Sequence, residues 1–461
     1  MTASLPPYPA YKETGIPWLP RIPAHWELRR GKMLFDVIDA RSETGTEELL
    51  TVSAEHGVIP RRNANVTMFK AESYVGYKLC WPGDLVINSL WAWARGLGVS
   101  RYHGIVSSAY SVYRPKAFVN GKYIHNLARS SPFQWELQVR SKGIWVSRLQ
   151  LTDEAFLNAP FPLPPLPEQH AIARYLDWAD ARITRLIRLR ERQVKLLEEY
   201  KQALIHQAVT GQIDVRTGKP YPEYKDSGIP WLGKVPKHWE VQRLRTLVEL
   251  RVSNVDKRSS ESEIPVRLCN YVDVYKNEYI FSDLPFMRAT ATETEIERFR
   301  LQAGDVLITK DSEVWNDIGV PALVVESADD LISGYHLALL RPYWHLISGE
   351  YLFRALQSKR VVSQLHISAN GVTRFGLSHN AIKSVWIPVP PLSEQAFIEK
   401  FLNRQTTKIY SAIDVIRRSI ELLREYRTRL IADVVTGQVD VRTIAARLPS
   451  PEEEENALIA E

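Results

Sequence analysis

Four short motifs contain residue types that occur in catalytic loops, and none of them completes its pattern. LPPY at 5–8 is similar to the NPPY-type loop of adenine methyltransferases but lacks the leading Asn or Asp. GQIDVRTGKP at 211–220 is similar to a phosphate-binding loop, yet its spacing is wrong and its final Pro replaces the Ser or Thr that would hold magnesium. GLG at 96–98 lacks the third glycine of a dinucleotide fingerprint. PEYK at 222–225 holds a nuclease-like Glu-x-Lys pair, but the corresponding segment at 9–12 reads PAYK.

Histidines and cysteines add no metal site to this picture. The eleven histidines are scattered without the spacing of metal ligands. Cys80 and Cys269 are too few for a disulfide framework or a four-ligand zinc site, and we expect them to be buried thiols. His25 and His238 each precede a Trp in a repeated segment, which favours packing over catalysis. The sequence therefore predicts no catalytic residue, no metal ligand and no cofactor bound by this chain.

The motifs lie within or beside a long internal repeat. Residues 7–26, PYPAYKETGIPWLPRIPAHW, return at 220–239 as PYPEYKDSGIPWLGKVPKHW, with thirteen of twenty positions identical. A second block at 163–217 contains LPPLPEQ and VTGQIDVRT, and it returns at 389–443 with VPPLSEQ and VTGQVDVRT. The offsets are 213 and 226, so the second half has about thirteen extra residues in its middle. The chain consists of two similar halves.

The repeated blocks predict two long helices. Residues 168–210 contain no proline or glycine, and apolar side chains recur every three or four residues along one face. The same positions shifted by 226 form an equal face in the second half. A helix of about 40 residues is ~60 Å long, too long for one small domain to cover. We therefore expect the two faces to pack against each other as a coiled coil, the alternative being two separate helices that each lie on their own domain.

The expected helix–helix seam is apolar, with polar interruptions at Arg190, Lys201, Gln405 and Arg427 that could set its register. Its apolar members are Ile172, Leu176, Ile183, Ile187, Val194, Leu197, Leu204, Ile398, Leu402, Ile409, Ile413, Ile416, Ile420, Leu423, Leu430 and Val434.

Two divergent segments, 27–160 and 240–386, lie between the repeated blocks. Runs such as DLVINSL, SAYSVYRP, DVLITK and HLALLRP are apolar and β-branched, and Gly or Pro interrupts them about every ten residues, which favours short strands. Short helices are expected near 124–140 and 350–364. The predicted fold class is α+β, with two mixed, strand-rich domains and two long helices.

Length, charge and hydropathy narrow the class of protein. A chain of 461 residues is expected to contain at least two domains. The amino terminus lacks a signal pattern and no stretch approaches ~20 apolar residues, so we expect a cytoplasmic protein without a membrane span. Without residues 446–461, whose PSPEEEE run is typical of a solvated tail, the chain carries 58 basic and 48 acidic residues. This moderately basic character is compatible with a polyanionic partner.

Two divergent domains joined by matched helices can present two different surfaces, and basic, aromatic loops favour DNA as the target. Arg and Lys can neutralise phosphates or bond guanine, whereas Asn suits adenine. The candidate DNA-binding residues are Arg61, Arg62, Lys70, Trp91, Arg95, Arg101, Tyr102, Lys310, Trp315, Asn316, Arg374 and His379.

The arm with GIPWL and a closing HW, the PLPPLPEQ and PVPPLSEQ helix starts and the TGQID and TGQVD helix ends occur twice in the same order. This pattern, which extends to about residue 443, resembles the specificity subunits of type I restriction–modification systems. The resemblance implies that each divergent segment is a target recognition domain that reads one half of an asymmetric, bipartite sequence in double-stranded DNA. It implies an antiparallel coiled coil that sets the spacer between the half-sites and docks two modification subunits.

The resemblance also places the chemistry on partner subunits. Modification subunits would carry S-adenosylmethionine and methylate adenine, and restriction subunits would add translocation and cleavage with ATP and Mg²⁺. Two alternatives stay open: a partnerless coiled-coil DNA-binding or antirestriction protein, and a self-contained DNA methyltransferase or nuclease. The bases read and the spacer length do not follow from the sequence, because side-chain readout depends on docking geometry.

The implied domains follow the repeat. After the first helix, VRT is followed by the arm sequence PYPxYK, whereas VRT after the second helix is not. The amino-terminal arm would take the corresponding place after the second helix, which would make a pseudo-twofold, circular repeat. The expected parts are an arm and first recognition domain at 1–160, a first spacer helix at 161–212, a repeated arm and second recognition domain at 213–386, a second spacer helix at 387–442 and an acidic, disordered tail at 443–461.

Overall fold

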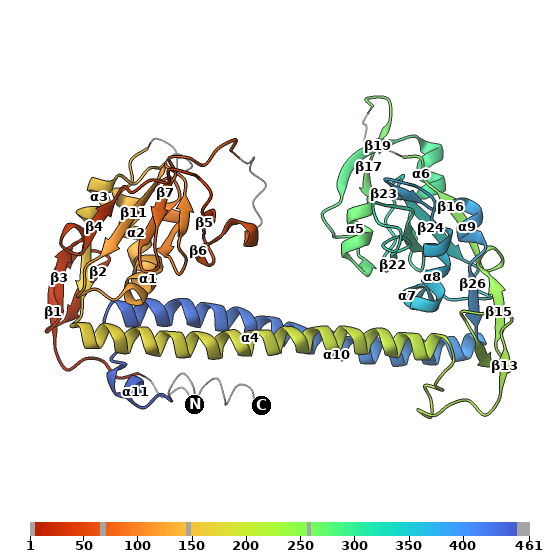
Figure 1. The fold of residues 1–461 in the computed structure, drawn as a ribbon. Coiled ribbons are helices and arrows are strands. Elements are labelled where there is room, and N and C mark those ends of the chain that lie inside the picture. Colours follow the sequence, from red (N-terminus) through yellow and green to blue (C-terminus); the bar gives the residue numbers. More distant parts are fainter. Residues whose placement is uncertain (1–4, 65–70, 144–148, 256–259, 450–461) are drawn as a thin grey trace. The chain divides into compact units, whose positions relative to one another are not determined.

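The computed structural model describes residues 5–64, 71–143, 149–255 and 260–449. The chain divides into two compact units, of which unit 1 comprises Met1–Glu191 and Arg418–Glu461 and unit 2 comprises Arg192–Arg417. Each unit contains one strand-rich domain and one segment of each long helix (Figure 1). We call the strand-rich parts domain 1, before residue 164, and domain 2, between residues 220 and 390.

Domain 1 is built from short strands and three short helices. Its strands are β1 (Tyr11–Ile16), β2 (Leu19–Pro23), β3 (Glu27–Arg30), β4 (Phe35–Ile38), β5 (Leu50–Ser53), β6 (Gly57–Pro60), β7 (Lys78–Cys80), β8 (Leu85–Asn88), β9 (Leu97–Val99), β10 (Gly104–Val106), β11 (Tyr110–Pro115) and β12 (Pro160–Leu163). Its helices are α1 (Gly121–Arg129), α2 (Ser131–Arg140) and α3 (Asp153–Leu157), with 3-10 turns η1 (Gly31–Met33), η2 (Arg61–Asn63) and η3 (Ala92–Ala94).

The main sheet of domain 1 has the order β4-β11-β8-β9, and all its pairs are antiparallel. Side chains alternate between its two faces, as the pleat of a strand requires. Leu85 and Ile87 of β8 belong to the core that also contains Tyr123 of α1 and Phe133 of α2, whereas Val86 faces a second cluster. The two faces of β8 therefore contribute to two different hydrophobic cores.

Domain 2 repeats this plan with additions. Its strands are β13 (Tyr224–Asp226), β14 (Lys234–Pro236), β15 (Glu240–Arg243), β16 (Val248–Val252), β17 (Ile264–Cys269), β18 (Tyr279–Ile280), β19 (Met287–Ala291), β20 (Val306–Thr309), β21 (Asp311–Ser312), β22 (Pro321–Val324), β23 (Leu331–Ser333), β24 (Leu337–Pro342), β25 (Phe375–Gly376) and β26 (Trp386–Val389). Its helices are α5 (Tyr271–Lys276), α6 (Glu293–Phe299), α7 (Gly349–Gln357), α8 (Lys359–Ser368) and α9 (His379–Lys383), with the turn η5 (Leu244–Thr246).

The main sheet of domain 2, β16-β24-β20-β22-β18, corresponds to the main sheet of domain 1 with one strand added. The arm hairpins β1–β2 and β13–β14 correspond, as do the pairs β3–β12 and β15–β26. A three-stranded sheet, β19-β17-β23, lies in domain 2 only among the described residues. The expected short helices are confirmed as the pairs α1–α2 and α7–α8.

The two long helices are α4 (Leu166–Val209) and α10 (Leu392–Val435), each of 44 residues. The helix expected over 168–210 is confirmed, and it begins two residues earlier because proline is tolerated in a first helical turn. Gly211 (φ +69°) and Gly437 (φ +72°) end the helices in the left-handed region. Gln212 N donates to Gln207 O over 2.9 Å and Gln438 N donates to Asp433 O over 2.8 Å, which are the bonds of a Schellman cap.

Within each unit the α4 and α10 segments lie side by side and run antiparallel. As residue numbers rise along α4, the partners on α10 fall, and the fold class is confirmed as α+β with an antiparallel helix pair. The contacts that show the direction are Asp180–Arg427 and Glu191–Arg424 in unit 1, and Glu198–Arg417 and Lys201–Tyr410 in unit 2.

None of the sixteen apolar seam residues is exposed. Eleven are buried, and the other five are half-buried: Ile187, Val194, Leu197, Ile416 and Leu423. The polar interruption at Lys201 is also buried. Its charge is tolerated there because the ammonium donates to Glu278 over 2.7 Å and to the Tyr410 hydroxyl over 2.9 Å. These contacts join α4, domain 2 and α10 within unit 2.

The end of α10 continues into the arm at the start of the chain. Tyr11 Oη donates to Gln438 O over 3.2 Å, as the equivalent Tyr224 Oη does to Gln212 O over 3.3 Å. Asp440 N donates to Pro6 O over 2.7 Å. The amino-terminal arm therefore takes the place after α10 that the second arm takes after α4, as the circular repeat predicts.

The expectation of disorder over 443–461 is wrong for its first part. Residues Arg442–Ala446 form a short helix, α11, and Ala445 is buried in the core of unit 1. Ile444 and Leu448 pack against the same core, and this apolar burial explains why these residues are ordered. Residues 450–461, with all the glutamates of the tail, lie outside the described residues.

Candidate nucleic-acid interface

Each arm is fastened to the first turn of a long helix by one buried glutamate. Glu168 is 6% exposed and accepts hydrogen bonds from Tyr8 Oη at 2.7 Å and Trp26 Nε1 at 2.9 Å, while His25 Nε2 lies 2.7 Å from its other oxygen. Burial, and then the bond to Glu168, raises the pKa of Tyr8, so this hydroxyl stays a donor. Three aromatic residues of the arm thus converge on one carboxylate of α4.

Unit 2 repeats this cluster with the same residue types. Glu394 accepts from Tyr221 Oη and from Trp239 Nε1, the latter over 3.1 Å, and His238 Nε2 lies 2.8 Å from it. The recurrent His-Trp pair is therefore a structural clamp, which confirms the packing role expected for His25 and His238. We call the two groups the arm clamps.

The glutamine after each clamp glutamate fastens the domain to the helix. Gln169 Oε1 accepts from Asn120 N over 2.7 Å, directly before α1, and Gln169 Nε2 donates to Pro164 O over 2.8 Å. In unit 2, Gln395 Oε1 accepts from Ser348 N over 2.9 Å, directly before α7. The EQ pair of the repeated motif therefore joins arm, domain and helix, and leaves the loops of the sheet to vary.

The main candidate loop of domain 1 follows β8 and contains Trp91 and Arg95. Trp91 is 53% exposed and stacks on Trp93 with ring centroids 6.0 Å apart. Arg95 has φ +62°, a left-handed backbone that is uncommon for a residue with a side chain, and its N–H donates to Gln134 Oε1 over 2.8 Å. The loop thus holds an aromatic surface and an exposed arginine in a defined turn.

Arg129 of α1 holds this loop from behind. Its guanidinium donates to five carbonyl oxygens at 2.6–3.3 Å, those of Ser53, Ala54, Glu55, Arg95 and Leu97. Burial, followed by the charge of Arg95, lowers the pKa of Arg129 to about 10, which leaves it charged at neutral pH. Arg129 is therefore a positioning residue that ties the β5–β6 turn to the β8–β9 loop.

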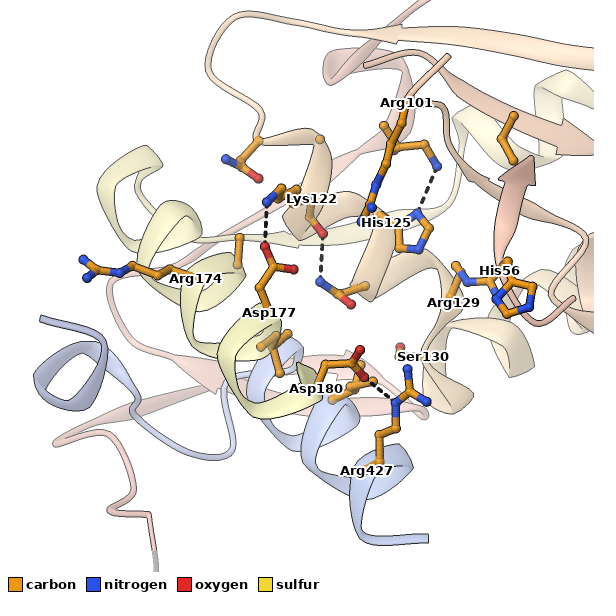
Figure 2. Close-up of a pocket in the computed structure, with 18 of the residues that line it drawn as sticks. His56, Arg101, Lys122, His125, Arg129, Ser130, Arg174, Asp177, Asp180 and Arg427 are labelled. Carbon is orange, nitrogen blue, oxygen red and sulfur yellow. Dashed lines mark hydrogen bonds and ion pairs between the residues drawn. The ribbon is translucent and has the colours of Figure 1, made fainter. Parts of the chain in front are cut away.

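Arg95, Arg101 and Tyr102 line a cleft of about 1360 Å³ between domain 1 and the helix segments of unit 1. Figure 2 shows Arg101 beside His125 of α1, and the ion pairs Lys122–Asp177 and Arg427–Asp180. His125 Nδ1 accepts from Val99 N over 3.2 Å, and burial, followed by Arg129 and Arg101, lowers its pKa to about 4. His125 is therefore neutral, and the charge of the cleft comes from its arginines and lysine.

Domain 2 joins two candidate loops that are far apart in the sequence. Strands β21 and β25 pair, and Leu377 N donates to Lys310 O over 2.9 Å. An Arg374 guanidinium nitrogen lies 3.3 Å from His336 Nε2, and His336 Nδ1 lies 2.8 Å from Asp311. Lys310 and Arg374 thus belong to one polar cluster, in which Asp311 and His336 hold the arginine.

The remaining candidates of domain 2, Trp315, Asn316 and His379, are exposed. Trp315 is 50% exposed and meets His366 edge to face, with ring centroids 6.4 Å apart. Asn316 is exposed in the same loop. His379 is exposed at the first position of α9.

Other candidates of domain 1 lie outside the cleft. Arg61 and Arg62 form part of η2, and Arg62 pairs with Glu48 over 3.2 Å at the surface. Neither residue lines the cleft. Lys70 lies outside the described residues. The structure therefore brings Arg95, Arg101 and Tyr102 together in domain 1, and Lys310 and Arg374 in domain 2.

Sequence reasoning missed Arg129 and His336, which hold the candidate loops. No spacing rule links a helix residue to loops about 30 and 75 positions away, so Arg129 carried no signal. The arm clamps did carry one, because Tyr8, His25, Trp26 and Glu168 all recur in the second half. That joint recurrence is a signal in the sequence alone that pairs the arm with the start of the helix.

Among the described residues, no group of three or more His, Cys, Asp or Glu could hold a metal ion. Cys80 and Cys269 are buried free thiols, as expected, and burial raises the pKa of Cys80 to about 11. In the same described part of the chain, no helix is long and apolar enough to span a membrane.

The sequence is similar to specificity subunits of type I restriction enzymes. It is 25% identical over 212 residues to a protein described as the MjaX specificity subunit of Methanocaldococcus jannaschii, a match that covers 45% of this chain and 48% of the relative. It is 23% identical over 315 residues to the EcoKI specificity subunit of Escherichia coli, covering 67% of this chain and 62% of that protein. The MjaVIII specificity subunit of M. jannaschii is 22% identical over 317 residues, covering 67% and 68%. The chain thus matches about half to two thirds of the length of these relatives, and no protein-family model matches it.

Solved structures share the fold. A chain from a study of complex assembly and conformational transition in a type I R-M system superimposes with a TM-score of 0.67 at 17% identity, covering 91% of this chain and 99% of that chain. The HsdS subunit of Thermoanaerobacter tengcongensis superimposes with a TM-score of 0.51 at 17% identity, covering 91% and 98%.

Proposed function

We propose that this chain, which is a specificity subunit of the type I restriction–modification family, reads an asymmetric, bipartite DNA sequence with its two domains. Domain 1 reads one half-site through Arg95, Arg101, Tyr102 and Trp91, and domain 2 reads the other through the cluster around Arg374. The observation that carries the proposal is the division of the chain into repeated and divergent parts. The arm clamps and helix ends recur nearly unchanged, whereas the loops that follow β8 and β20, SLWAWARG at 89–96 and KDSEVWND at 310–317, have different sequences.

This division suits two readers of different sequences. A loop that reads base edges must vary with its target, because each base pair presents its own pattern of donors and acceptors. The frame that holds the loop need not vary, and its bonds are the same in both units. Two copies of one frame with different loops then read two different half-sites.

The reactions belong to other subunits in this proposal. Modification subunits carry S-adenosylmethionine and methylate adenine, and restriction subunits use ATP and Mg²⁺ to translocate and cleave DNA. The support is the incomplete state of every methyltransferase-like, phosphate-loop and nuclease-like motif in the sequence, together with the names of the relatives. This chain selects the DNA sequence and holds the other subunits.

A test of the whole proposal lengthens the helices. Insertion of seven residues, one heptad, at equivalent points of α4 and α10 adds about 10 Å, or roughly three base pairs of DNA. We expect the methylated motif to keep both half-sites and to gain spacer positions, as read by sequencing of N6-methyladenine in cells. A control insertion of seven residues in the loop at 343–346 should leave the spacer unchanged. Methylation at the original spacing in the helix variant would argue against a helix-determined spacer.

A second apolar stripe on the long helices supports the docking of two identical modification subunits. It is 45–70% exposed and separate from the buried seam. The members on α4 reappear on α10 after a shift of 226, as Leu189 with Val415, Leu196 with Leu422 and Tyr200 with Tyr426. Spacings of seven and four place these side chains on one face of each helix. Two equivalent apolar faces fit two copies of one partner better than a single partner.

Charges placed in the stripe test this docking. Leu189→Glu on α4 and Val415→Glu on α10 should each lower the number of modification subunits bound, because an unpaired carboxylate opposes burial in an interface. Mass photometry of the copurified complex should shift from two modification subunits per chain towards one for either single variant, and towards none for the double variant. Glu199→Gln, at an exposed position of α4 outside the stripe, is the control. Full occupancy in the double variant would place the docking surface elsewhere.

A further inference from the structure

The cleft of unit 1 carries more positive charge than its own carboxylates neutralise. Seven of its lining residues are Arg or Lys, and three are Asp or Glu. Lys122 and Arg427 are paired with Asp177 and Asp180. Within the described part of the chain, Arg101 has neither an ion pair nor a hydrogen bond from its side chain. The Arg95 side chain has one long contact, 3.5 Å to Ser131 Oγ.

The chain reaches the edge of this cleft immediately before its most acidic stretch. Leu448 and Pro449 line the cleft, and the guanidinium of Arg174 donates to their carbonyl oxygens over 2.6 and 3.0 Å. The sequence continues as SPEEEENALIAE, with Glu452–Glu455 three to six residues beyond Pro449. At no more than ~3.6 Å per residue, three to six residues of chain can reach at most roughly 10–20 Å.

We propose that the acidic segment, residues 450–461, binds in the cleft of unit 1 and competes there with DNA phosphates. In this binding mode the four consecutive carboxylates of Glu452–Glu455 would pair with Arg95 and Arg101, which have no carboxylate partner among the described residues. The cleft is partly enclosed by domain 1 and the helix segments, where screening by salt is weaker than on an open surface. Arg174 fixes the point from which the segment starts.

Competition with DNA rests on the proposed function, because it assumes that Arg95, Arg101 and Tyr102 contact DNA. The segment then lowers the affinity for DNA of any sequence, because that affinity depends on contacts with phosphates. DNA that contains the specific half-site still displaces the segment from the cleft. Such a contact reduces sequence-independent binding, which depends on phosphate charge. Contact between the segment and the cleft does not depend on the function of the protein.

The first experiment tests the contact alone, in the full chain without DNA. A water-soluble carbodiimide couples a carboxylate to a lysine amine when the two touch, and Lys122 lines the cleft. Mass spectrometry should find Glu452–Glu455 coupled to Lys122, with a yield that falls at least several-fold in the variant Arg95→Ser, Arg101→Ser. Lys32, in η1 of the same domain and outside the cleft lining, is the internal control. Equal coupling to Lys122 and Lys32, or a yield that ignores the arginines, would overturn the proposal.

The second experiment measures competition. The full-length variant with Glu452, Glu453, Glu454 and Glu455 changed to Gln should bind non-cognate duplex DNA about 3–10-fold more tightly at ~50 mM salt, and the difference should vanish at ~300 mM. A free peptide of sequence SPEEEENALIAE should weaken DNA binding by the variant, whereas a scrambled neutral peptide should not. Coupling to Lys122 without a change in DNA affinity would keep the contact but remove the competition. Failure of every form to bind DNA would count against the proposed function and leave the coupling result intact.

Discussion

Exchange of residues 27–160 for the corresponding segment of a relative with a different target is expected to replace one half of the methylated sequence. The other half and the spacer should stay as they are. The physical reason is that the exchanged segment carries the loops after β8 and β9, while the arm clamp at Glu168 and the seam remain native. Sequencing of N6-methyladenine in cells that carry the hybrid reads both halves at once.

The reciprocal exchange of 240–386 should change only the second half of the motif, and it controls for general damage by chimera formation. A finer version is the single substitution Arg374→Ala. The variant should methylate the original motif less and should accept other bases in the second half-site, because a bidentate arginine contact contributes about 1–3 kcal/mol of discrimination against the wrong base. A change in both half-sites after a single exchange would contradict the independence of the two domains.

Glu168→Ala is expected to cause the largest loss of stability, about 3–5 kcal/mol. The substitution removes the acceptor of two buried donors, Tyr8 Oη and Trp26 Nε1, and the partner of the exposed His25. The midpoint of thermal unfolding should fall by roughly 10 °C for a unit of this size. The arm should also separate from α4, so trypsin should cut at Lys12 or Arg21 before the remainder of the chain unfolds.

Two further variants give this result its meaning. Glu199→Ala makes the same change at an exposed position of α4 and should alter stability by no more than about 0.5 kcal/mol. Glu168→Gln keeps an oxygen for Tyr8 and Trp26 and should lose less than Glu168→Ala. A Glu168→Ala chain as stable as the Glu199→Ala chain would mean that the arm clamp does not hold the arm.

The architecture was predictable because the sequence contains an internal repeat. A helix face repeated at a fixed offset predicts a seam between the two helices. The arm sequence follows the first long helix and also occurs at the start of the chain, and this pattern predicts that the amino-terminal arm packs after the second helix. Both arise from local pattern, and Tyr11 bonded to Gln438 shows the closure directly. The prediction of disorder from residue 443 gave too much weight to Glu452–Glu455 and too little to the apolar Ile444, Ala445 and Leu448, which pack in the core of unit 1.

The candidate interface was predictable only as a set of loops. Charge and exposed aromatic residues pointed to the loops after β8 and β20, but the partners of those loops lie elsewhere in the chain. Arg374 meets His336 and Asp311 only because β21 pairs with β25, which is a tertiary event without a local signal. Arg129 likewise acts on backbone carbonyls, whose positions no side-chain pattern encodes. Which of the candidate residues touch bases stays a prediction.

The most direct test of DNA sequence specificity is a genome-wide map of N6-methyladenine in cells with and without this gene, with the genes of the modification subunits left in place. The proposed function predicts that one asymmetric, gapped motif is methylated when the gene is present and unmethylated when it is absent. The gene reintroduced on a plasmid should restore that motif. Identical maps with and without the gene, in cells that express active modification subunits, would contradict the claim that this chain selects the DNA sequence.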